Sequence, residues 1–156
     1  MVIRRAQKED ISDILRLLQQ VLQIHADIRP DIFISGTTKY TEEELQERIT
    51  HTEDPIFVAE IDGCVCGYIF CEKQGRAHSS NMTDITTLYI DDLCVDAEYR
   101  GRHIGHKLYE YAEKYAGKNG FYNITLNVWA GNDDAEIFYE KIGLKPQKTT
   151  LEKILK

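Results

Sequence analysis

Apolar and polar residues follow two periods along this chain, one typical of helices and one typical of strands. After Asp10, apolar residues recur at helical spacing, which predicts an amphipathic helix. Its apolar positions are Ile11, Ile14, Leu15, Leu18 and Leu22. Residues 2–4 are expected to form a short strand before it, and residues 25–40, with a proline, a glycine and mixed polarity, are expected to form a loop. Thr41 and Glu44 then form a capping-box pattern, which predicts a second helix.

Strand-like segments dominate the middle of the chain. Residues 56–61 and 64–71 flank Asp62-Gly63. Because Asp-Gly supplies the positive φ angles of a type I′ turn, the two segments predict an antiparallel hairpin. Residues 73–83 are polar and are expected to be loop, and residues 85–95 are rich in β-branched and aromatic side chains, which predicts another strand.

Helix and strand alternate in the last third of the chain. A helix with an apolar face is predicted to end at Asn119-Gly120. That face comprises Ile104, Leu108, Tyr111, Ala112 and Tyr115. Residues 122–129 predict a strand, and Asn132 or Asp133 is expected to cap a last helix. The tail, residues 145–156, is expected to add one more strand.

The element order β-α-α-β-β-β-α-β-α-β predicts an α/β fold in which a mixed sheet carries helices on both faces. A chain of 156 residues suits one compact domain, and no repeat or low-complexity run divides it. We therefore expect a single domain over residues 1–156.

Composition limits the kinds of molecule that the chain is expected to bind. The net charge of -7 argues against nucleic acid, which requires a basic face, and suits a small cationic partner. No stretch approaches the roughly 20 apolar residues of a membrane helix, and the first ten residues hold no apolar run, so a cytoplasmic protein that binds no membrane is expected. The four cysteines, in strand-like segments, are expected to be reduced and buried. Cys64-Val65-Cys66 could seed a metal site, but no second Cys/His pair stands at zinc spacing, so no metal is expected.

Residues 100–107 concentrate positive charge in this acidic chain. Five of these eight residues are basic or histidine: Arg100, Arg102, His103, His106 and Lys107. The segment joins a predicted strand to a predicted helix, whose start presents free backbone N–H groups and a partial positive charge. Gly101 and Gly105 let a phosphate approach the backbone. A pyrophosphate site is predicted, although a solvated basic turn has the same composition.

Two motifs resemble those of the GNAT superfamily of N-acetyltransferases. Residues 88–105, LYIDDLCVDAEYRGRHIG, are similar to its acetyl-CoA-binding motif, Gln/Arg-x-x-Gly-x-Gly/Ala after a strand. Residues 132–144, NDDAEIFYEKIGL, are similar to Asn-x-x-Ala-x-x-Phe-Tyr-x-x-x-Gly-Phe. The resemblance covers nearly the whole chain. It implies a mixed, mostly antiparallel sheet of about six to seven strands with a splayed pair, about four helices, and acetyl transfer from acetyl-CoA to an amine without a metal.

The resemblance also implies which residues bind acetyl-CoA. Backbone groups of the splayed strand would bind the pantetheine arm, and the loop after it would bind the pyrophosphate. These residues are Leu93, Cys94, Val95, Arg100, Gly101, Arg102, His103, Ile104, Gly105 and His106, with Asn132 and Tyr139 from the second motif. One position departs from the family pattern, because His103 stands where the motif has its first glycine. Its side chain either crowds the phosphates, points outward or adds a donor.

Catalytic roles follow from the same comparison. Tyr139 matches the family tyrosine beside the CoA sulfur and would protonate the leaving thiolate, although a core aromatic has the same spacing. Asp91 is similar in position to an acceptor-site base of diamine acetyltransferases and would attract the ammonium or relay its proton. Strand alternation is expected to place Asp91 and Asp92 on opposite faces. An acetyl-enzyme on Cys94 is a further route, and direct transfer is preferred.

The acceptor-binding residues come from variable positions. Residues 25–33 match the family's acceptor loop, in which His25, Asp27 and Asp31 are candidate contacts, together with Asp92 and Asn127. Asn127 stands where some relatives have a glutamate base, and it cannot take a proton. The expected acceptor is a small amine, a polyamine or a peptide amine. The alternatives are a protein or peptide N-acetyltransferase and a non-catalytic acyl-CoA-binding or regulatory module. Dimers are common in the family, so the resemblance also implies a homodimer.

Overall fold

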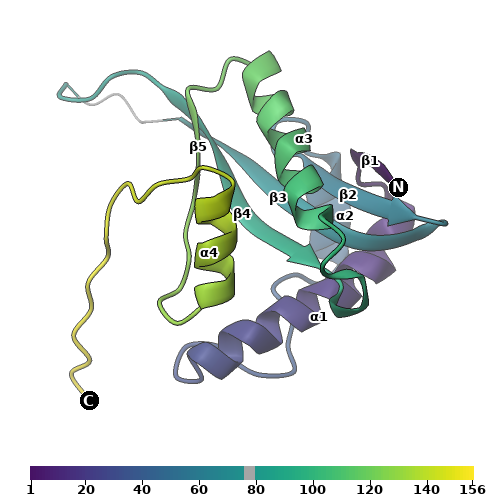
Figure 1. Cartoon of the computed structure of the whole chain (residues 1–156), viewed down its shortest axis with the longest axis horizontal. Coiled ribbons are helices and arrows are strands. Elements are labelled where there is room, and N and C mark those ends of the chain that lie inside the picture. Colours follow the sequence, from purple (N-terminus) through teal and green to yellow (C-terminus); the bar gives the residue numbers. More distant parts are fainter. Residues whose placement is uncertain (76–79) are drawn as a thin grey trace.

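The computed structural model describes residues 1–75 and 80–156 as a sheet with helices on both faces (Figure 1). The elements in chain order are β1 (Val2–Arg5), α1 (Ile11–Ile28), α2 (Glu42–Thr50), β2 (Ile56–Ile61), β3 (Cys64–Gly75), β4 (Thr86–Val95), α3 (Ile104–Lys118), β5 (Asn123–Leu126) and α4 (Asp133–Lys141). Short 3-10 helices, Lys8–Asp10 and Ala97–Tyr99, precede α1 and follow β4. The α/β class expected from the sequence is confirmed.

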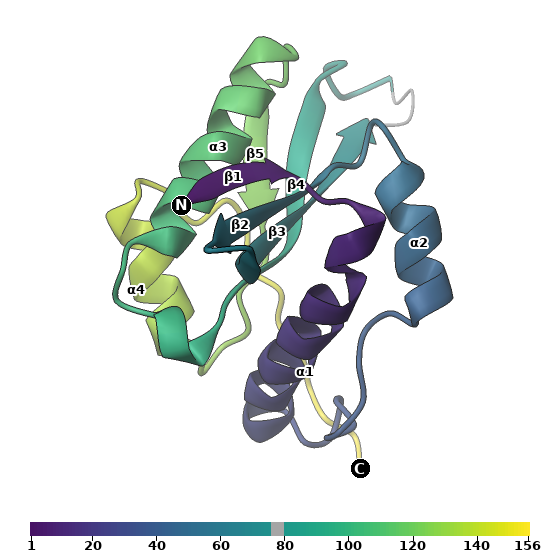
Figure 2. The same ribbon diagram turned by 90° about the vertical axis from the view of Figure 1, so that its right-hand side faces the viewer.

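The sheet has the strand order β1-β2-β3-β4-β5. Strands β1 to β4 pair antiparallel with one another, and β5 runs parallel to β4. Helices α1 and α2 lie on one side of the sheet, and α3 and α4 lie on the other (Figure 2). Among the described residues, no helix is both long enough and apolar enough to cross a bilayer.

Each face of the sheet carries its own apolar core. Beneath α1 and α2 the buried side chains include Leu17, Leu18 and Tyr68. Beneath α3 they include Ile69, Leu88 and Leu108. Burying a leucine side chain contributes about 2 kcal/mol, so the two layers fix the helices on the sheet. Gly67 lets α3 approach closely, since a Cβ there would meet the Cys94 carbonyl oxygen at 3.0 Å and Leu108 at 3.1 Å.

A bulge at Asp91 changes which face of the sheet the later side chains of β4 point to. Phe70 of β3 pairs with Asp92, but the next residue, Cys71, pairs with Ile90, which leaves Asp91 as the extra residue. Ile90 consequently packs in the core beneath α3, whereas Cys94, four positions later, packs beneath α1. The simple alternation expected for this strand is therefore wrong at Asp91.

Strands β4 and β5 part at the same place. Their pairing begins at Thr87–Asn123 and ends at Ile90–Leu126, while β4 continues to Val95 along β3. Beyond Ile90, the backbone groups of β4 on the side of β5 have no strand partner among the described residues. The splayed pair is confirmed.

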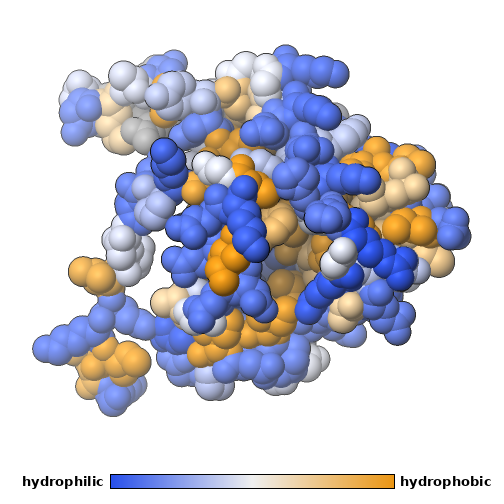
Figure 3. Space-filling view, viewed as in Figure 1, coloured by the Kyte–Doolittle hydropathy of each residue, from blue (hydrophilic) through white to orange (hydrophobic). Residues whose placement is uncertain are grey.

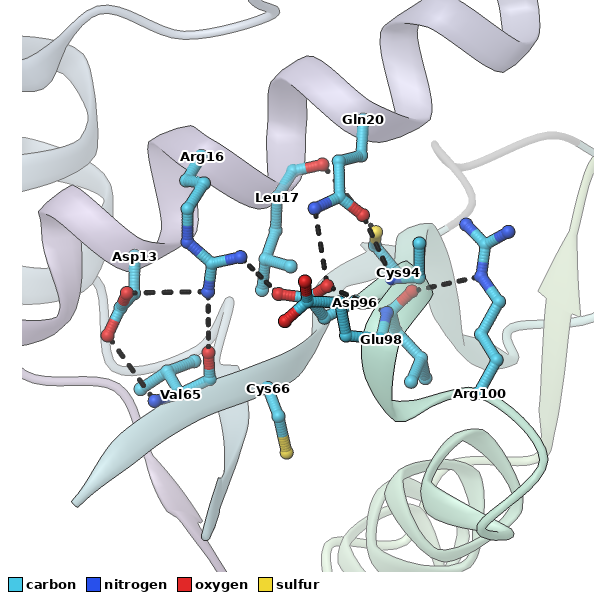
Figure 4. A network of polar contacts seen from close by, with 12 residues as sticks. Asp13, Arg16, Leu17, Gln20, Val65, Cys66, Cys94, Asp96, Glu98 and Arg100 are labelled. Carbon is cyan, nitrogen blue, oxygen red and sulfur yellow. Dashed lines mark hydrogen bonds and ion pairs between the residues drawn. The ribbon is translucent and has the colours of Figure 1, made fainter. Parts of the chain in front are cut away.

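Buried Asp96 anchors the end of β4 to α1 (Figure 4). Its carboxylate pairs with Arg16, accepts from Gln20 at 3.4 Å and accepts the Glu98 N–H at 3.1 Å. Burial alone would raise the pKa of Asp96, but these hydrogen bonds outweigh it and the pKa is lowered. Arg16 also donates to the Val65 carbonyl at 3.1 Å, so α1, β3 and the loop after β4 are held together.

Several boundaries differ from the sequence-based expectations. Residues 25–28 belong to α1, so the expected loop begins later. Strand β3 continues to Gly75, into the expected 73–83 loop, of which residues 76–79 lie outside the described residues. Strand β5 ends at Leu126 because the chain leaves β4 there. Cys64, at the hairpin turn, is exposed, and all four cysteines are free thiols.

The expected tail strand is wrong. The described sheet has five strands, fewer than the six to seven expected, because residues 145–156 form no strand and lead away from α4 as extended chain (Figure 1). Glu152 of this tail accepts a hydrogen bond from Arg29 at the end of α1. Leu151, Ile154 and Leu155 are 67–89% exposed. A strand requires a partner edge, and the tail reaches none in its own chain.

Candidate active site

A cavity of about 460 Å³ opens where β4 and β5 part. Asp91, Asp92 and Leu93 of β4 form one wall, and residues 127–129 after β5 form the opposite wall. Helix α1 adds Leu18, Val21, Leu22 and His25, the segment between α1 and α2 adds Phe33 and Lys39, and α4 adds Ala135 and Tyr139. Mostly apolar walls with a few polar groups are typical of a small-molecule site.

The bulge directs two adjacent carboxylates into this cavity. Asp91 accepts from the Lys39 ammonium at 2.6 Å and from the Tyr40 hydroxyl at 3.2 Å. Asp92 accepts from the Tyr68 hydroxyl at 2.8 Å. Both line the cavity, contrary to the opposite faces expected from alternation, because the extra residue at Asp91 shifts the phase of the strand. Asp91 therefore carries a cationic partner, whereas Asp92 has a neutral one.

Burial raises the pKa of Asp92 to about 6, although the hydrogen bond from Tyr68 opposes the shift. A carboxyl group with this pKa is ionised at neutral pH and binds a proton more readily than an exposed aspartate does. Groups of this kind are typical of general bases.

Tyr139 lines the same cavity from α4. Burial, and next the nearby negative charge of Asp92, raise the pKa of Tyr139 above its ordinary value. The phenol therefore keeps its proton at neutral pH, which a proton donor requires. Its neighbour Phe138 does not line the cavity, and the centres of the Phe138 and Tyr139 rings lie 5.1 Å apart.

The structure brings some of the candidate acceptor residues together and leaves others outside. His25 and Asn127 line the cavity. Burial lowers the pKa of His25, and Asn127 donates to the Tyr89 hydroxyl at 3.2 Å. Asp27 and Asp31 do not line it: Asp27 accepts from Gln23 on α1, and the exposed Asp31 pairs with Arg29.

The basic segment forms the start of α3, as the charge pattern indicated. Arg100, Gly101, Arg102 and His103 are exposed, whereas the Ile104 side chain is buried, so Ile104 offers only its backbone. The first N–H groups of an α-helix have no partner within the helix, which suits them to an anion. His106 pairs with Glu110 at 3.1 Å along the helix.

The backbone conformation of His103 explains why a glycine would suit this position. It is the N-cap of α3 and has φ +59° and ψ +19°, in the left-handed region where a side chain costs about 1–2 kcal/mol. Gly101, two residues earlier, has φ +76°. The loop thus turns sharply at both residues before α3 begins.

A chain of contacts joins this loop to the cavity. A Cβ on Gly105 would lie 3.4 Å from the Phe138 ring and 3.6 Å from Val95. Val95 is the last residue of β4, and Phe138 precedes Tyr139 on α4. The helix start, the splayed end of β4 and α4 therefore meet, and an extended molecule with a phosphate at one end and a reactive group at the other fits this arrangement.

Cys94 is turned away from this path. Its thiol donates to the Leu17 carbonyl of α1 at 3.5 Å, within the core, and burial raises its pKa to about 12 (Figure 4). A nucleophilic cysteine requires an accessible thiolate. The backbone of Cys94 lies on the splayed part of β4, so only its backbone is placed to meet a ligand.

Some of the residues that line the cavity were not among the candidates named from the sequence. Lys39 and Phe33 lie in the segment between the first two helices, and Trp129 follows β5. The Phe33 ring stacks edge-on against Trp129 at 5.4 Å, and the Arg29 guanidinium lies over the Trp129 ring. Tyr68 was missed as well, because its contact with Asp92 depends on the register of β3 with β4. No group of three or more His, Cys, Asp or Glu side chains is placed to hold a metal in the part of the chain that the structure describes.

Known proteins match the chain over most of its length. An uncharacterised N-acetyltransferase of Methanocaldococcus jannaschii is 27% identical over 146 residues, which are 94% of this chain and 61% of that protein. A thialysine N-epsilon-acetyltransferase of Sus scrofa is 27% identical over 161 residues, 93% of this chain and 84% of that protein. A crystal structure of a mutant Bacillus halodurans protein superposes with a TM-score of 0.95 at 30% identity and covers 99% of both chains.

The sequence profile of the Acetyltransferase (GNAT) family matches residues 18–144. This range includes the cavity, the splayed strands, the loop at the start of α3 and Tyr139. The fold, the two motifs and the profile agree, and the chain belongs to the GNAT family of acetyltransferases.

Proposed function

We propose that this chain transfers an acetyl group from acetyl-CoA to the primary amine of a small molecule by direct attack. One observation carries the proposal: the Asp91 and Asp92 carboxylates line the cavity between the splayed strands, and packed side chains connect this cavity to the basic start of α3. The GNAT family generally uses acetyl-CoA and amine acceptors, which supports the same reading.

The chain's own residues fit acetyl-CoA. The N–H groups at the start of α3, with Arg100 and Arg102 beside them, suit the pyrophosphate. The backbone groups of Leu93 and Val95 have no strand partner on the side of β5, which suits them to the amides of the pantetheine arm. The Val95 carbonyl accepts from Arg100 at 3.3 Å, and the Leu93 N–H donates to the Asp92 carboxylate, so the arm would replace these local contacts. The bound thioester supplies an activated acetyl carbon. Asn132 caps α4 through the Ala135 N–H at 3.4 Å and positions that helix.

In the proposed mechanism Asp92 takes the proton. An amine acceptor is protonated at neutral pH and must lose a proton before it attacks. Asp92, with a pKa of about 6 and a neutral partner, is better suited to accept that proton than Asp91, whose charge is matched by Lys39. Asp92 therefore replaces Asp91 as the proposed base, and Asp91 would attract an acceptor cation that displaces Lys39 from it. Tyr139 gives its proton to the departing thiolate.

The acceptor is proposed to be an amine on a flexible aliphatic chain. Helix α1 and Leu126 give the cavity apolar walls that suit methylene groups, and the two carboxylates suit an ammonium at one end. The Sus scrofa relative is named for an ε-amine of a lysine analogue, which has this chemistry.

The proposal is tested by incubating the protein with acetyl-CoA and a panel of lysine analogues, polyamines, aminoglycosides and peptides. We expect release of the CoA thiol with at least one aliphatic amine, and calorimetry should report binding of acetyl-CoA. Binding without thiol release from any amine would favour the non-catalytic module. Release only with peptides would favour a peptide N-acetyltransferase.

A homodimer is part of the proposal, and the tail supports it. Leu151, Ile154 and Leu155 are 67–89% exposed, and the tail extends away from most of the molecule at the lower left of Figure 3. Strand β5 is an edge strand with no second neighbour in the described residues. An extended tail with exposed apolar side chains and a free strand edge on one chain are complementary between two copies related by a two-fold axis. The tail of each copy is proposed to lie along β5 of the other.

A further inference from the structure

The Lys39 side chain enters the proposed acceptor site from the segment between α1 and α2. Its Nζ lies 2.6 Å from Asp91 Oδ2 and 5.7 Å from the centre of the Tyr40 ring. It is the one lysine among the described residues that line this cavity. An amine of this chain therefore lies on the carboxylate that is proposed to attract the acceptor.

We propose that Lys39 is itself an acetylation site, modified by the chain's own active site. The inference rests on the proposed function, since it uses the same cavity and the same acetyl donor. The acceptor that the cavity is built to take is an aliphatic primary amine, and Lys39 presents one on a four-carbon chain that is already in place. Holding a reactant beside the reacting centre replaces a bimolecular encounter with an internal step.

The chemistry balances without a further reactant. The neutral ε-amine attacks the acetyl carbonyl carbon, a C–N bond forms and the C–S bond breaks with its electron pair on sulfur. The Lys39 ammonium first gives one proton to Asp92, which releases it to solvent. The nitrogen loses a second proton as the amide forms; Tyr139 protonates the CoA thiolate and is reprotonated by that second proton. The products are acetyl-lysine and the CoA thiol.

Acetylation of Lys39 would change the charge of the site. An acetylated lysine has no positive charge, so its ion pair with Asp91 is lost and that carboxylate becomes available to a cationic acceptor. The Lys39 side chain is 44% exposed, so it can leave the cavity toward solvent after modification. The modified chain is therefore expected to bind a cationic acceptor more tightly than the unmodified chain does.

Lys73 is a matched control within the same chain. It also pairs with a carboxylate, that of Glu53, and its side chain is 43% exposed. It lines a different surface depression, beside Tyr115 and Phe121. Chemical acetylation in solution depends on exposure and charge, which are alike at the two lysines, so a difference between them reports the cavity.

The test incubates the full-length protein with acetyl-CoA alone and follows acetylation by intact-mass and peptide mass spectrometry. We expect one acetyl group per chain, on Lys39, at a rate on the order of 100-fold above that at Lys73 and independent of protein concentration. The Lys39→Arg variant, which keeps the ion pair, should not acquire this group, whereas Lys73→Arg should acquire it as the wild type does.

Three results would overturn the inference while leaving the proposed function intact. The first is a protein that acetylates an added amine but leaves Lys39 unmodified. The second is equal acetylation of Lys39 and Lys73, and the third is an unchanged acetylation pattern after heat denaturation. Failure of the proposed function itself would be recognised separately, by the absence of both acetyl-CoA binding in calorimetry and thiol release with every amine.

Discussion

Tyr139 and Asp92 lie in one cavity, and burial raises the pKa of both with opposite consequences. The shift keeps the Tyr139 phenol protonated, so it can give a proton, and brings Asp92 toward the range in which a carboxylate takes one. Two titratable groups with different pKa values in one site are typical of an acid and a base.

Tyr139→Phe is expected to lower kcat by about 10- to 100-fold, because the departing thiolate loses its proton donor. The dissociation constant of acetyl-CoA should change little, since the ring remains. Steady-state kinetics and calorimetry measure the two quantities. Tyr122→Phe, at a 72% exposed tyrosine, is the control and should leave both unchanged. Wild-type turnover in Tyr139→Phe would remove this role.

At the scale of elements, the turn between β4 and α3 determines how the backbone of the helix start is presented. His103→Gly removes the Cβ from a left-handed position, which gains about 1–2 kcal/mol, and adds backbone entropy to the unfolded chain, which costs about 0.5–1 kcal/mol.

We therefore expect His103→Gly to keep or slightly raise the free energy of unfolding, and to keep or tighten acetyl-CoA binding. Denaturant titration and calorimetry measure these. Gly101→Ala, at φ +76° in the same turn with open space around it, should lower stability by about 1 kcal/mol. A clear loss of acetyl-CoA affinity in His103→Gly would mean that the imidazole itself binds the ligand.

Asp96 stabilises the fold by joining the end of β4 to α1. A carboxylate whose pKa is lowered in the folded state stabilises the fold above its unfolded pKa and loses that effect as the pH falls through its folded pKa. Since Arg16 is 43% exposed, we expect Asp96→Asn to cost about 1–2 kcal/mol at neutral pH and less near pH 3.

Chemical denaturation at the two pH values measures this cost. Asp13→Asn is the control, because Asp13 also pairs with Arg16, at 3.4 Å, but is 37% exposed, so its loss should be smaller. Equal losses in the two variants, or a loss that does not depend on pH, would contradict the role given to Asp96.

The sequence predicted these elements better than it predicted the site. Local signals identified the Asp62-Gly63 turn, which has φ +52° and +80°, and the Thr41 capping box, which forms with both hydrogen bonds. The bulge at Asp91 has no local signal, because it depends on the register of β3 with β4. For the same reason the contacts of Asp92 with Tyr68, and of Asp91 with Lys39, were not predicted.

In the whole molecule, the tail is the segment that finds no strand partner among the described residues of its own chain. The sequence of residues 145–156 suits a strand, and the sheet offers a free edge at β5, but the tail lies elsewhere. Pairing between two copies would give the tail a strand partner and would cover the free edge of β5. The expectation of a strand was wrong within one chain, and no local pattern reveals that its proposed partner would lie in another chain.

Size-exclusion chromatography with light scattering is expected to give a dimer for the full chain and a monomer after deletion of residues 145–156. Leu151→Asp with Leu155→Asp should also give a monomer, because both side chains lose their apolar contact, whereas Lys153→Asp should remain a dimer. A monomeric full-length protein at micromolar concentration, or a dimeric truncated one, would exclude the tail as the interface.

Amine acetylation is proposed to occur where β4 and β5 part, with Asp92 as the base. The pH dependence of turnover for an accepted aliphatic amine, in the wild type and in Asp92→Asn, tests this role. We predict that wild-type turnover rises with pH through about 6, and that Asp92→Asn loses about 100-fold and this rise. The variant should be at least as stable as the wild type at neutral pH, because a carboxyl with a raised folded pKa loses its stabilising effect as the pH rises through that pKa. Asp62→Asn, at the exposed hairpin turn, should behave as the wild type. Wild-type rates and an unchanged pH profile in Asp92→Asn would contradict the claim.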